Sequence, residues 1–433
     1  MGKKSKYSQR RRKKTTKTGN NREGSGYQQI FEQAVNLHLA GHPREAAALY
    51  RKVLTLKPDF PEAYYNLGNA LFDQGRLDEA ADCFVKATTN KPDYAEAHYN
   101  LGVVLQDLDR LDESTSSYQQ AVKFKPDYAE AHHNLGTIFF NQGKLEEAVR
   151  SMQIAVENAP GNILFSDDFI VLLNDFMPTG AIDSVYIQAQ RSLQQVSKGY
   201  GGTHLITDET VRRIYQKCND ILIRHKLVVH TNKTQLYRGS IGQDNCPRHK
   251  MVFNRFNIIP EYCFSCYKVA FEPRTVLELF KLLFVFEKIK LPGDNSRKCI
   301  VEVRPDIPGT YKGFIYCKSM DEGKEILDIV RPMVEEEISK GIPALIKRGC
   351  SEFQLKYPQY GSVDNKTQQM SYNEEWRRYE AYADKDMKNE SFENPHNFSH
   401  NHPGFTLLDI LVMNNWLAYA AERGDSSYLK IVN

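Results

Sequence analysis

The sequence lacks a long apolar segment. Its apolar runs are short, and Leu282–Phe286, for example, contains only five residues. A membrane-spanning helix needs about 20 consecutive residues that are mostly apolar, so no membrane span is expected. The charged N-terminal residues are also not followed by an apolar stretch, which argues against a secretory signal peptide. With 41% hydrophobic and 26% charged residues in a chain of 433, the composition predicts a folded cytoplasmic protein of two or three domains.

The first 22 residues lack acidic side chains, although they contain ten Lys or Arg. Like charges repel one another and this segment has little to bury, so we predict a disordered basic tail over residues 1–26. Such a tail either binds an anionic partner, such as nucleic acid, the ribosome or an acidic membrane surface, or is simply solvated. Residues 23–433 contain 47 basic and 54 acidic residues. The excess positive charge therefore belongs to the tail alone.

Three segments repeat with a period of 34 residues. Each begins with a Glu-Ala pair and carries Leu-Gly at the same place, namely Leu67–Gly68, Leu101–Gly102 and Leu135–Gly136. Prolines at positions 92, 126 and 160 follow the same step, and a weaker copy precedes the first. The glycines allow two helices to approach closely, and the prolines end each second helix. A single helix pair cannot bury its apolar face, which predicts a stacked solenoid.

These repeats resemble the tetratricopeptide repeat (TPR) family over residues 27–160, and they are similar to the repeats of O-linked N-acetylglucosamine transferases. The resemblance implies an α solenoid of four helix-turn-helix units. It also implies a protein or peptide partner that lies on the concave face. The apolar helical pattern that follows the fourth copy predicts capping helices and a linker over residues 161–200.

Asparagine recurs one residue before each of the three leucines, at Asn66, Asn100 and Asn134. A side-chain amide offers a donor and an acceptor, so three in register can hold the backbone of an extended peptide. The same ladder occurs in the transferase repeats that this segment resembles. The alternative is that asparagine is merely common at this repeat position. Neighbouring candidates for peptide contacts are Tyr65, Tyr99 and His133.

The second half of the chain alternates strand and helix patterns. Over residues 264–350 the order is β-α-β-β-α-β, which is typical of a ferredoxin-like split βαβ unit with strand order 4-1-3-2. We therefore expect a Cys-rich α+β domain at residues 201–355. A helical C-terminal extension is predicted for residues 356–433.

Four candidate metal ligands precede the first of these strands, at Cys246, His249, Cys263 and Cys266. Two pairs, each spaced by two residues, are typical of a tetrahedral zinc knuckle in which tight turns point both members of a pair at one ion. Zinc is the favoured metal, and an iron–sulfur cluster is the less favoured cofactor. The alternatives are two unrelated turns with a buried histidine, or a redox pair formed by Cys263 and Cys266.

The predicted topology also places further cysteines near this motif. The starts of strands 1 and 2 lie at the same end of the sheet as the ends of strands 3 and 4. Four cysteines should therefore converge at that end, namely Cys266, Cys299, Cys317 and Cys350. The last three of these are additional candidate ligands.

Nucleotide-binding and catalytic motifs are missing from the second half. It contains no GxGxxG or P-loop spacing, and no Ser-His-Asp set can be nominated. The sequence therefore favours a protein-interaction protein, with TPR repeats fused to a metal-binding α+β domain. The alternative is an enzyme that recruits its substrate through the repeats, either a metal- or thiol-dependent protein-modifying enzyme or a glycosyltransferase-like one.

Overall fold

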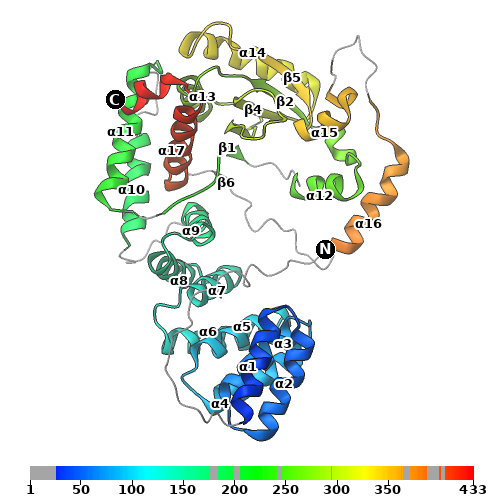
Figure 1. The fold of residues 1–433 in the computed structure, drawn as a ribbon. Coiled ribbons are helices and arrows are strands. Elements are labelled where there is room, and N and C mark those ends of the chain that lie inside the picture. The colour runs from blue at the N-terminus through cyan, green and yellow to red at the C-terminus, as the bar shows by residue number, and fades with distance from the viewer. Residues whose placement is uncertain are drawn as a thin grey trace. The chain divides into compact units, whose positions relative to one another are not determined.

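The computed structural model describes residues 26–175, 184–198, 205–227, 229–240, 246–293, 295–361, 363, 370–387, 399–400 and 405–433 (Figure 1). All but the last residue of the predicted basic tail lies outside this range. The chain forms two compact units, residues 1–138 and 139–433, and the boundary falls within helix α7 (Ala129–Asn141).

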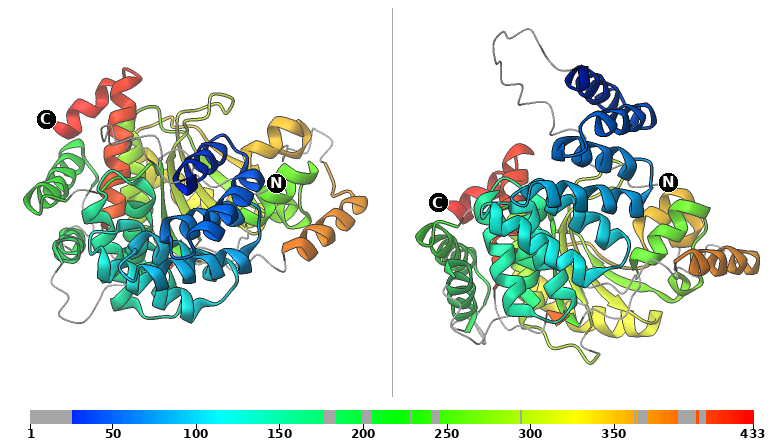
Figure 2. Two further views of the ribbon diagram at one scale, coloured as in Figure 1. Left: turned by 60° about the horizontal axis from the view of Figure 1, so that its bottom comes forward. Right: turned by 90° about the horizontal axis from the view of Figure 1, so that it is seen from below.

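The first unit consists of helices that pack in sequence order. They are α1 (Gly26–Leu39), α2 (Pro43–Leu56), α3 (Pro61–Phe72), α4 (Leu77–Asn90), α5 (Ala95–Asp107), α6 (Leu111–Phe124) and the start of α7. The helices α1 and α2, α3 and α4, and α5 and α6 pack as pairs, and each pair contacts the next. Figure 2 shows these helices, coloured blue to cyan, following one another as a series. The predicted helix-turn-helix repeats are confirmed.

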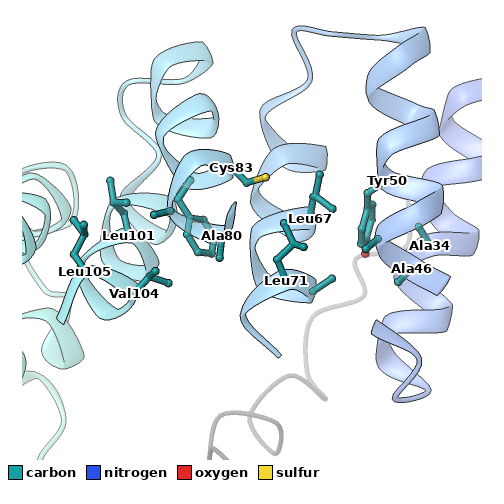
Figure 3. Close-up of a cluster of buried hydrophobic side chains, with 14 residues drawn as sticks. Ala34, Ala46, Tyr50, Leu67, Leu71, Ala80, Cys83, Leu101, Val104 and Leu105 are labelled. Atoms are coloured by element: carbon teal, nitrogen blue, oxygen red, sulfur yellow. The ribbon is translucent and has the colours of Figure 1, made fainter. Parts of the chain in front are cut away.

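Small residues bring the two helices of each pair together. A Cβ added to Gly68 would lie 2.7 Å from the ring of Phe84, and one added to Gly102 would lie 2.7 Å from the ring of Tyr118. Both rings are almost completely buried. One core runs through the first five helices, from Ala34 in α1 to Leu105 in α5 (Figure 3). Each pair therefore depends on its neighbours for burial, as expected for a solenoid.

The turns between paired helices use the left-handed backbone region. Gly41, Gly75 and Gly143 have φ values of 85°, 75° and 73°. Asp109 takes the same place after α5 with φ of 59°. A residue with a Cβ is strained there, although aspartate tolerates this conformation better than most.

The second unit combines helices with an antiparallel sheet. Before the sheet come α8 (Leu145–Asn158), α9 (Ile163–Asp175), α10 (Val185–Lys198) and α11 (Asp208–Arg224). The strands are β1 (Gln235–Ser240), β2 (Tyr267–Phe271), β3 (Arg297–Val301), β4 (Tyr311–Cys317), β5 (Ala344–Arg348) and β6 (Ser399–His400). The remaining longer helices are α12 (Cys246–Phe256), α13 (Val276–Lys288), α14 (Met320–Glu337), α15 (Ser351–Lys356), α16 (Arg377–Met387) and α17 (Leu407–Glu422), followed by the short α18 (Leu429–Val432).

The strands pair in the order β5-β2-β4-β3-β1-β6, and neighbouring strands are antiparallel. The first four of these strands lie in the order that the sequence predicted for residues 264–350. The sheet is larger than predicted, because β1 pairs with β3 and β6 adds a two-residue pairing to β1. Neither β1 nor β6 was expected from the sequence.

Helices α13 and α14 pack against β4 on one face of the sheet. Gly313 of β4 makes this possible, because an added Cβ would overlap Leu282 of α13. Thr275 and Ser319 cap the two helices by accepting a hydrogen bond from a backbone N–H three residues later. Pro332 lies inside α14, which nevertheless runs continuously from Met320 to Glu337.

A buried ion pair joins β1 to α17. Arg238 is 8% exposed and Asp409 is 3% exposed, and Nη1 of Arg238 donates to Oδ1 of Asp409 at 2.9 Å. Arg238 also donates to Glu287 of α13. Asp409 in turn accepts from the backbone N–H of Thr406 in the capping box of α17. Partners of this kind are required when charges are buried.

The structure corrects the predicted zinc-knuckle geometry. Residues Cys246–His249 were expected in a tight turn, but they form the first turn of α12. Pro247 suits this place, because the first turn of a helix does not need its backbone N–H. Cys263 lies in a short 3-10 helix, Glu261–Ser265, and Cys266 follows directly after it.

Candidate functional site

The three repeat asparagines occupy equivalent places on α3, α5 and α7, and all three are half-buried. Asn66 donates to the carbonyl of Glu62 at 2.8 Å, and Asn100 donates to Oδ1 of Asn69 at 2.7 Å. Asn134 donates to the Tyr118 hydroxyl at 3.0 Å. Each of these bonds uses one of the two N–H donors of an amide. The side chains are therefore oriented by the fold.

The neighbouring aromatic candidates differ in burial. The Tyr65 ring is half-buried and lies 5.0 Å from the ring of Tyr94. Tyr99 is only 3% exposed, with its ring 4.8 Å from that of Tyr128. Tyr99 thus offers little surface to a ligand. His133 is half-buried, like Tyr65.

In the second unit, His249, Cys263, Cys266 and Cys350 line one small cavity of about 10 Å³, together with Lys250, Tyr262, Gly349 and Phe353. This volume corresponds to about one water-sized sphere. His249 is 6% exposed and Cys263 is 5% exposed. The backbone N–H of Gly349 donates to the carbonyl of Cys266 at 2.8 Å, which places Cys350 beside the Cys263–Cys266 turn.

Two polar side chains surround these thiols. Lys268 lies with its Nζ 3.6 Å from Sγ of Cys350. The Tyr360 hydroxyl donates to the carbonyl of Cys263 at 2.5 Å. Burial, and then the neighbouring thiols, hold the pKa of Tyr360 well above its usual range. Tyr360 therefore stays protonated and acts as a hydrogen-bond donor.

The complete predicted metal set is not seen as one coordination group. The side chain of Cys246 lies outside the described part of the chain. Among the residues that the structure describes, no three His, Cys, Asp or Glu side chains are arranged closely enough to hold a metal ion. What the structure brings together is a histidine and three cysteines that line one cavity.

The remaining cysteines do not line that cavity. Cys299 was expected at the end of the sheet, but it is the third residue of β3 and lies opposite Gly313, with no exposed surface. Cys317 does lie at the expected end, opposite Tyr267, and it is 5% exposed. Burial raises the pKa of Cys317 to about 12 and that of Cys299 further. Both thiols are therefore protonated at neutral pH and suit core packing.

A group of lysines on the sheet was missed by the sequence analysis. Lys268, Lys298, Lys312 and Lys347 each lie in a different strand, β2, β3, β4 and β5. The signal that would have found them is period-two alternation, which places every second residue of a strand on one face. The four strands were predicted from the sequence, but the alignment of their lysines on one face of the sheet was not.

Comparisons with known proteins identify the repeats. Residues 44–75, 68–109 and 107–143 match the family described as TPR repeat, and residues 129–162 match the family described as Tetratricopeptide repeat. No curated protein matches the chain. Among the described residues, no helix is long and apolar enough to cross a membrane.

Two solved structures are similar to part of this chain. A MamA fragment from Desulfovibrio magneticus RS-1 is 23% identical with a TM-score of 0.33, covering 35% of this chain and 85% of that chain. YrrB, described as a TPR protein with an unusual peptide-binding site, is 22% identical with a TM-score of 0.31, covering 47% and 96%. The family matches do not extend into the α+β region. Residues 44–162 are therefore tetratricopeptide repeats, a class of protein–protein interaction repeat.

Proposed function

We propose that this protein is an interaction protein whose repeats bind an extended peptide segment through Asn66, Asn100 and Asn134. The observation that carries the proposal is their equivalent placement on α3, α5 and α7, at a constant step of 34 residues. The half-buried Tyr65 and His133 lie on the same helices, next to Asn66 and Asn134.

The chemistry of an amide supports this role. An extended peptide presents N–H and C=O groups that its own backbone does not satisfy. Each of the three amides keeps a second N–H donor and an acceptor oxygen beyond the bond that orients it. A side chain that the fold already orients loses less conformational entropy on binding. Backbone recognition of this kind selects an extended conformation rather than one sequence.

Peptide selection and affinity measurement test the proposal. Peptides are selected from a random display library on the full-length protein, and their affinities are measured for the triple variant Asn66→Ala, Asn100→Ala and Asn134→Ala. Loss of three amide contacts should weaken binding by about tenfold or more. The matched control replaces three exposed asparagines: Asn90, Asn141 and Asn158. Equal affinity of the wild-type protein and the first triple variant would contradict the proposal.

For the α+β region we propose a ferredoxin-like unit over residues 264–350, stabilised by a metal ion. The proposed ligands are Cys246, His249, Cys263 and Cys266, with Cys350 as the alternative to Cys246. Supporting this, thiol and imidazole groups line one cavity, and an ammonium group lies beside one of the sulfurs. Three thiolates and an imidazole are a typical donor set for zinc, and the alternative is an iron–sulfur cluster.

Elemental analysis of the purified protein tests the metal, because zinc gives a colourless protein and an iron–sulfur cluster a coloured one. Cys263→Ala should lower the metal content and loosen the α+β unit, since metal-binding free energy is also folding free energy. Cys317→Ala, outside the cavity, is the control. A metal-free wild-type protein whose melting is unchanged by a strong chelator would refute the site.

A further inference from the structure

Four lysines share the sheet face that lies away from α13 and α14, and three of them, Lys268, Lys298 and Lys347, surround one aromatic ring. Lys268 is paired with Lys347 of β5 and with Tyr316 of β4, and Lys298 is paired with Phe314. Directly paired residues of antiparallel strands point to the same face. Gly313 and Ile346, which face Leu282 of α13 and Gly323 of α14, lie at the alternate positions of β4 and β5. The lysines therefore project from the opposite face.

The three ammonium groups gather around one aromatic ring. The Nζ atoms of Lys268, Lys298 and Lys347 lie 5.7, 5.9 and 4.7 Å from the ring centroid of Phe314. Phe314 is 8% exposed and Lys268 is 6% exposed, while Lys298 and Lys347 are half-buried. Three positive charges thus lie close together where little solvent reaches them. Only Lys298 and Lys347 are partly exposed.

Carboxylates near this face reduce the repulsion between the lysines only in part. Glu352 pairs with Lys250 at 3.1 Å and also with Arg304. It also acts on Lys298, but less strongly than the neighbouring ammonium of Lys268 does. The lysines around Phe314 therefore repel one another at close range.

This concentration of charge is costly in the free protein. Burial, and then the neighbouring ammonium of Lys268, lower the pKa of Lys298 to about 8. The same two causes, in the same order, lower the pKa of Lys347 to about 8. Both groups are mostly charged at pH 7. A bound anion would offset both the burial and the mutual repulsion.

We propose that Lys268, Lys298 and Lys347 form a binding site for a ligand that carries two or more phosphate groups. Lysine ammonium groups bind phosphate as mobile point charges with three donors each. A single carboxylate would bring one negative charge to three ammonium groups, whereas linked phosphates bring several. The site lies on the sheet of the second unit, so it goes beyond the proposed peptide binding by the repeats.

Calorimetry with inorganic tripolyphosphate tests this site in the full-length protein at low salt. Lys298→Met and Lys347→Met keep the apolar stem and remove the charge. Each should weaken binding by about tenfold or more, as expected for a charge-assisted hydrogen bond. Lys324→Met is the matched control, because this exposed lysine lies on α14 and pairs with Asp321 at 2.9 Å. Any contribution of the basic N-terminal residues is common to all four proteins.

Two further readouts separate a binding site from a structural role. Without ligand, the two methionine variants should melt at or above the wild-type temperature, because they relieve repulsion between buried charges. In buffers of different ionisation enthalpy at pH 8, binding to the wild-type protein should take up protons, since the anion raises both lysine pKa values. Both variants should take up fewer protons.

A single-stranded oligonucleotide distinguishes the source of the phosphate. If the oligonucleotide competes with tripolyphosphate in the wild-type protein and binds more weakly to Lys298→Met, the ligand is a nucleic-acid backbone. If the oligonucleotide does not compete, the ligand is a free phosphate compound. Unchanged tripolyphosphate affinity in both methionine variants would overturn the proposal. So would the lack of any binding to the wild-type protein.

Discussion

The two units of this protein differ in how far apart in the sequence their contacting residues lie. In the repeats, Gln74 donates to the carbonyl of Pro43 and Asn100 contacts Asn69, each pair 31 residues apart. In the α+β unit, Arg238 and Asp409 are separated by 171 residues. The first unit is therefore a sum of neighbouring contacts, while the second needs segments from most of its length at once.

The two tryptophans of the chain make this difference measurable. Trp376 and Trp416 both lie in the α+β unit, and Trp416 is fully buried, with its indole N–H donating to the carbonyl of Thr234. Tryptophan fluorescence consequently follows the second unit alone. Circular dichroism follows the helices of both units. A change confined to one unit should separate the two signals.

The largest effect is expected from breaking the buried ion pair between Arg238 and Asp409. Asp409→Ala leaves the Arg238 charge buried with part of its compensation removed, which should destabilise the α+β unit by about 3–5 kcal/mol. Urea unfolding followed by tryptophan fluorescence measures this. Adding Arg238→Met should restore much of the loss, because the uncompensated charge is then gone. An unchanged urea midpoint in the single variant would show that the pair does not hold the unit together.

A substitution at a helix contact should affect the repeats instead. In Gly102→Val the new side chain meets the buried ring of Tyr118, so we expect a loss of about 1–3 kcal/mol from overpacking. Thermal melting by circular dichroism should shift down while the fluorescence transition stays in place. Gly161→Val is the control, since an added Cβ there meets nothing within 4 Å. A shift of both transitions together would mean that the two units unfold as one.

Raising the pH should stabilise only the second unit. Lys298 and Lys347 have pKa values of about 8, below the 10.5 of an ordinary lysine, so between these values the unfolded chain binds more protons. Stability should rise from about pH 8 to pH 9, by about 0.5 kcal/mol per lysine because both side chains keep contact with solvent. Above pH 9 the buried thiols of the same unit, such as Cys317, oppose this rise, because burial raises their pKa. Urea unfolding by fluorescence should show the rise in the wild-type protein and a flatter profile in Lys298→Met and Lys347→Met. Equal profiles would contradict the depressed pKa values.

The smallest expected effect is a gain in the repeats. Asp109→Gly relieves a left-handed backbone and removes a negative charge at the C-terminal end of α5. We expect a stabilisation of about 0.5–1 kcal/mol. The repeat melting temperature by circular dichroism should rise slightly, with the fluorescence transition unchanged. A lower melting temperature would mean that the aspartate makes a compensating contact.

The same difference in the sequence separation of contacts explains which parts of the fold could be predicted from the sequence. The repeats were visible because Gly68 and its equivalents recur with their partners within one period. The core strands β2 to β5 and helix α13 were recognised from their local apolar patterns. Strand β1 was missed because Gln235–Ser240 is largely polar and is defined by its pairing with β3, more than 50 residues later.

The candidate site was predicted in part for the same reason. The approach of Cys350 to Cys266 followed from the expected strand order, and the structure places both on one cavity. Cys246 and His249 were assigned to a turn because their spacing fits a knuckle, although the same spacing fits one turn of a helix. The lysine cluster was not predicted, because it requires four strands to be aligned residue by residue.

The ion pair between Arg238 and Asp409 also has a consequence for the order of events during synthesis. A chain grows at about 5–20 residues per second, so the 171 residues between the two side chains take roughly 10 to 35 s to make. The helix pairs of the first unit, from α1 to α6, pack on their neighbours in sequence and can form as they emerge from the ribosome. The arginine of β1, in contrast, stays without one of its carboxylate partners until α17 has been translated. The α+β unit can thus be completed only once α17 has been made, when the repeats have had time to fold.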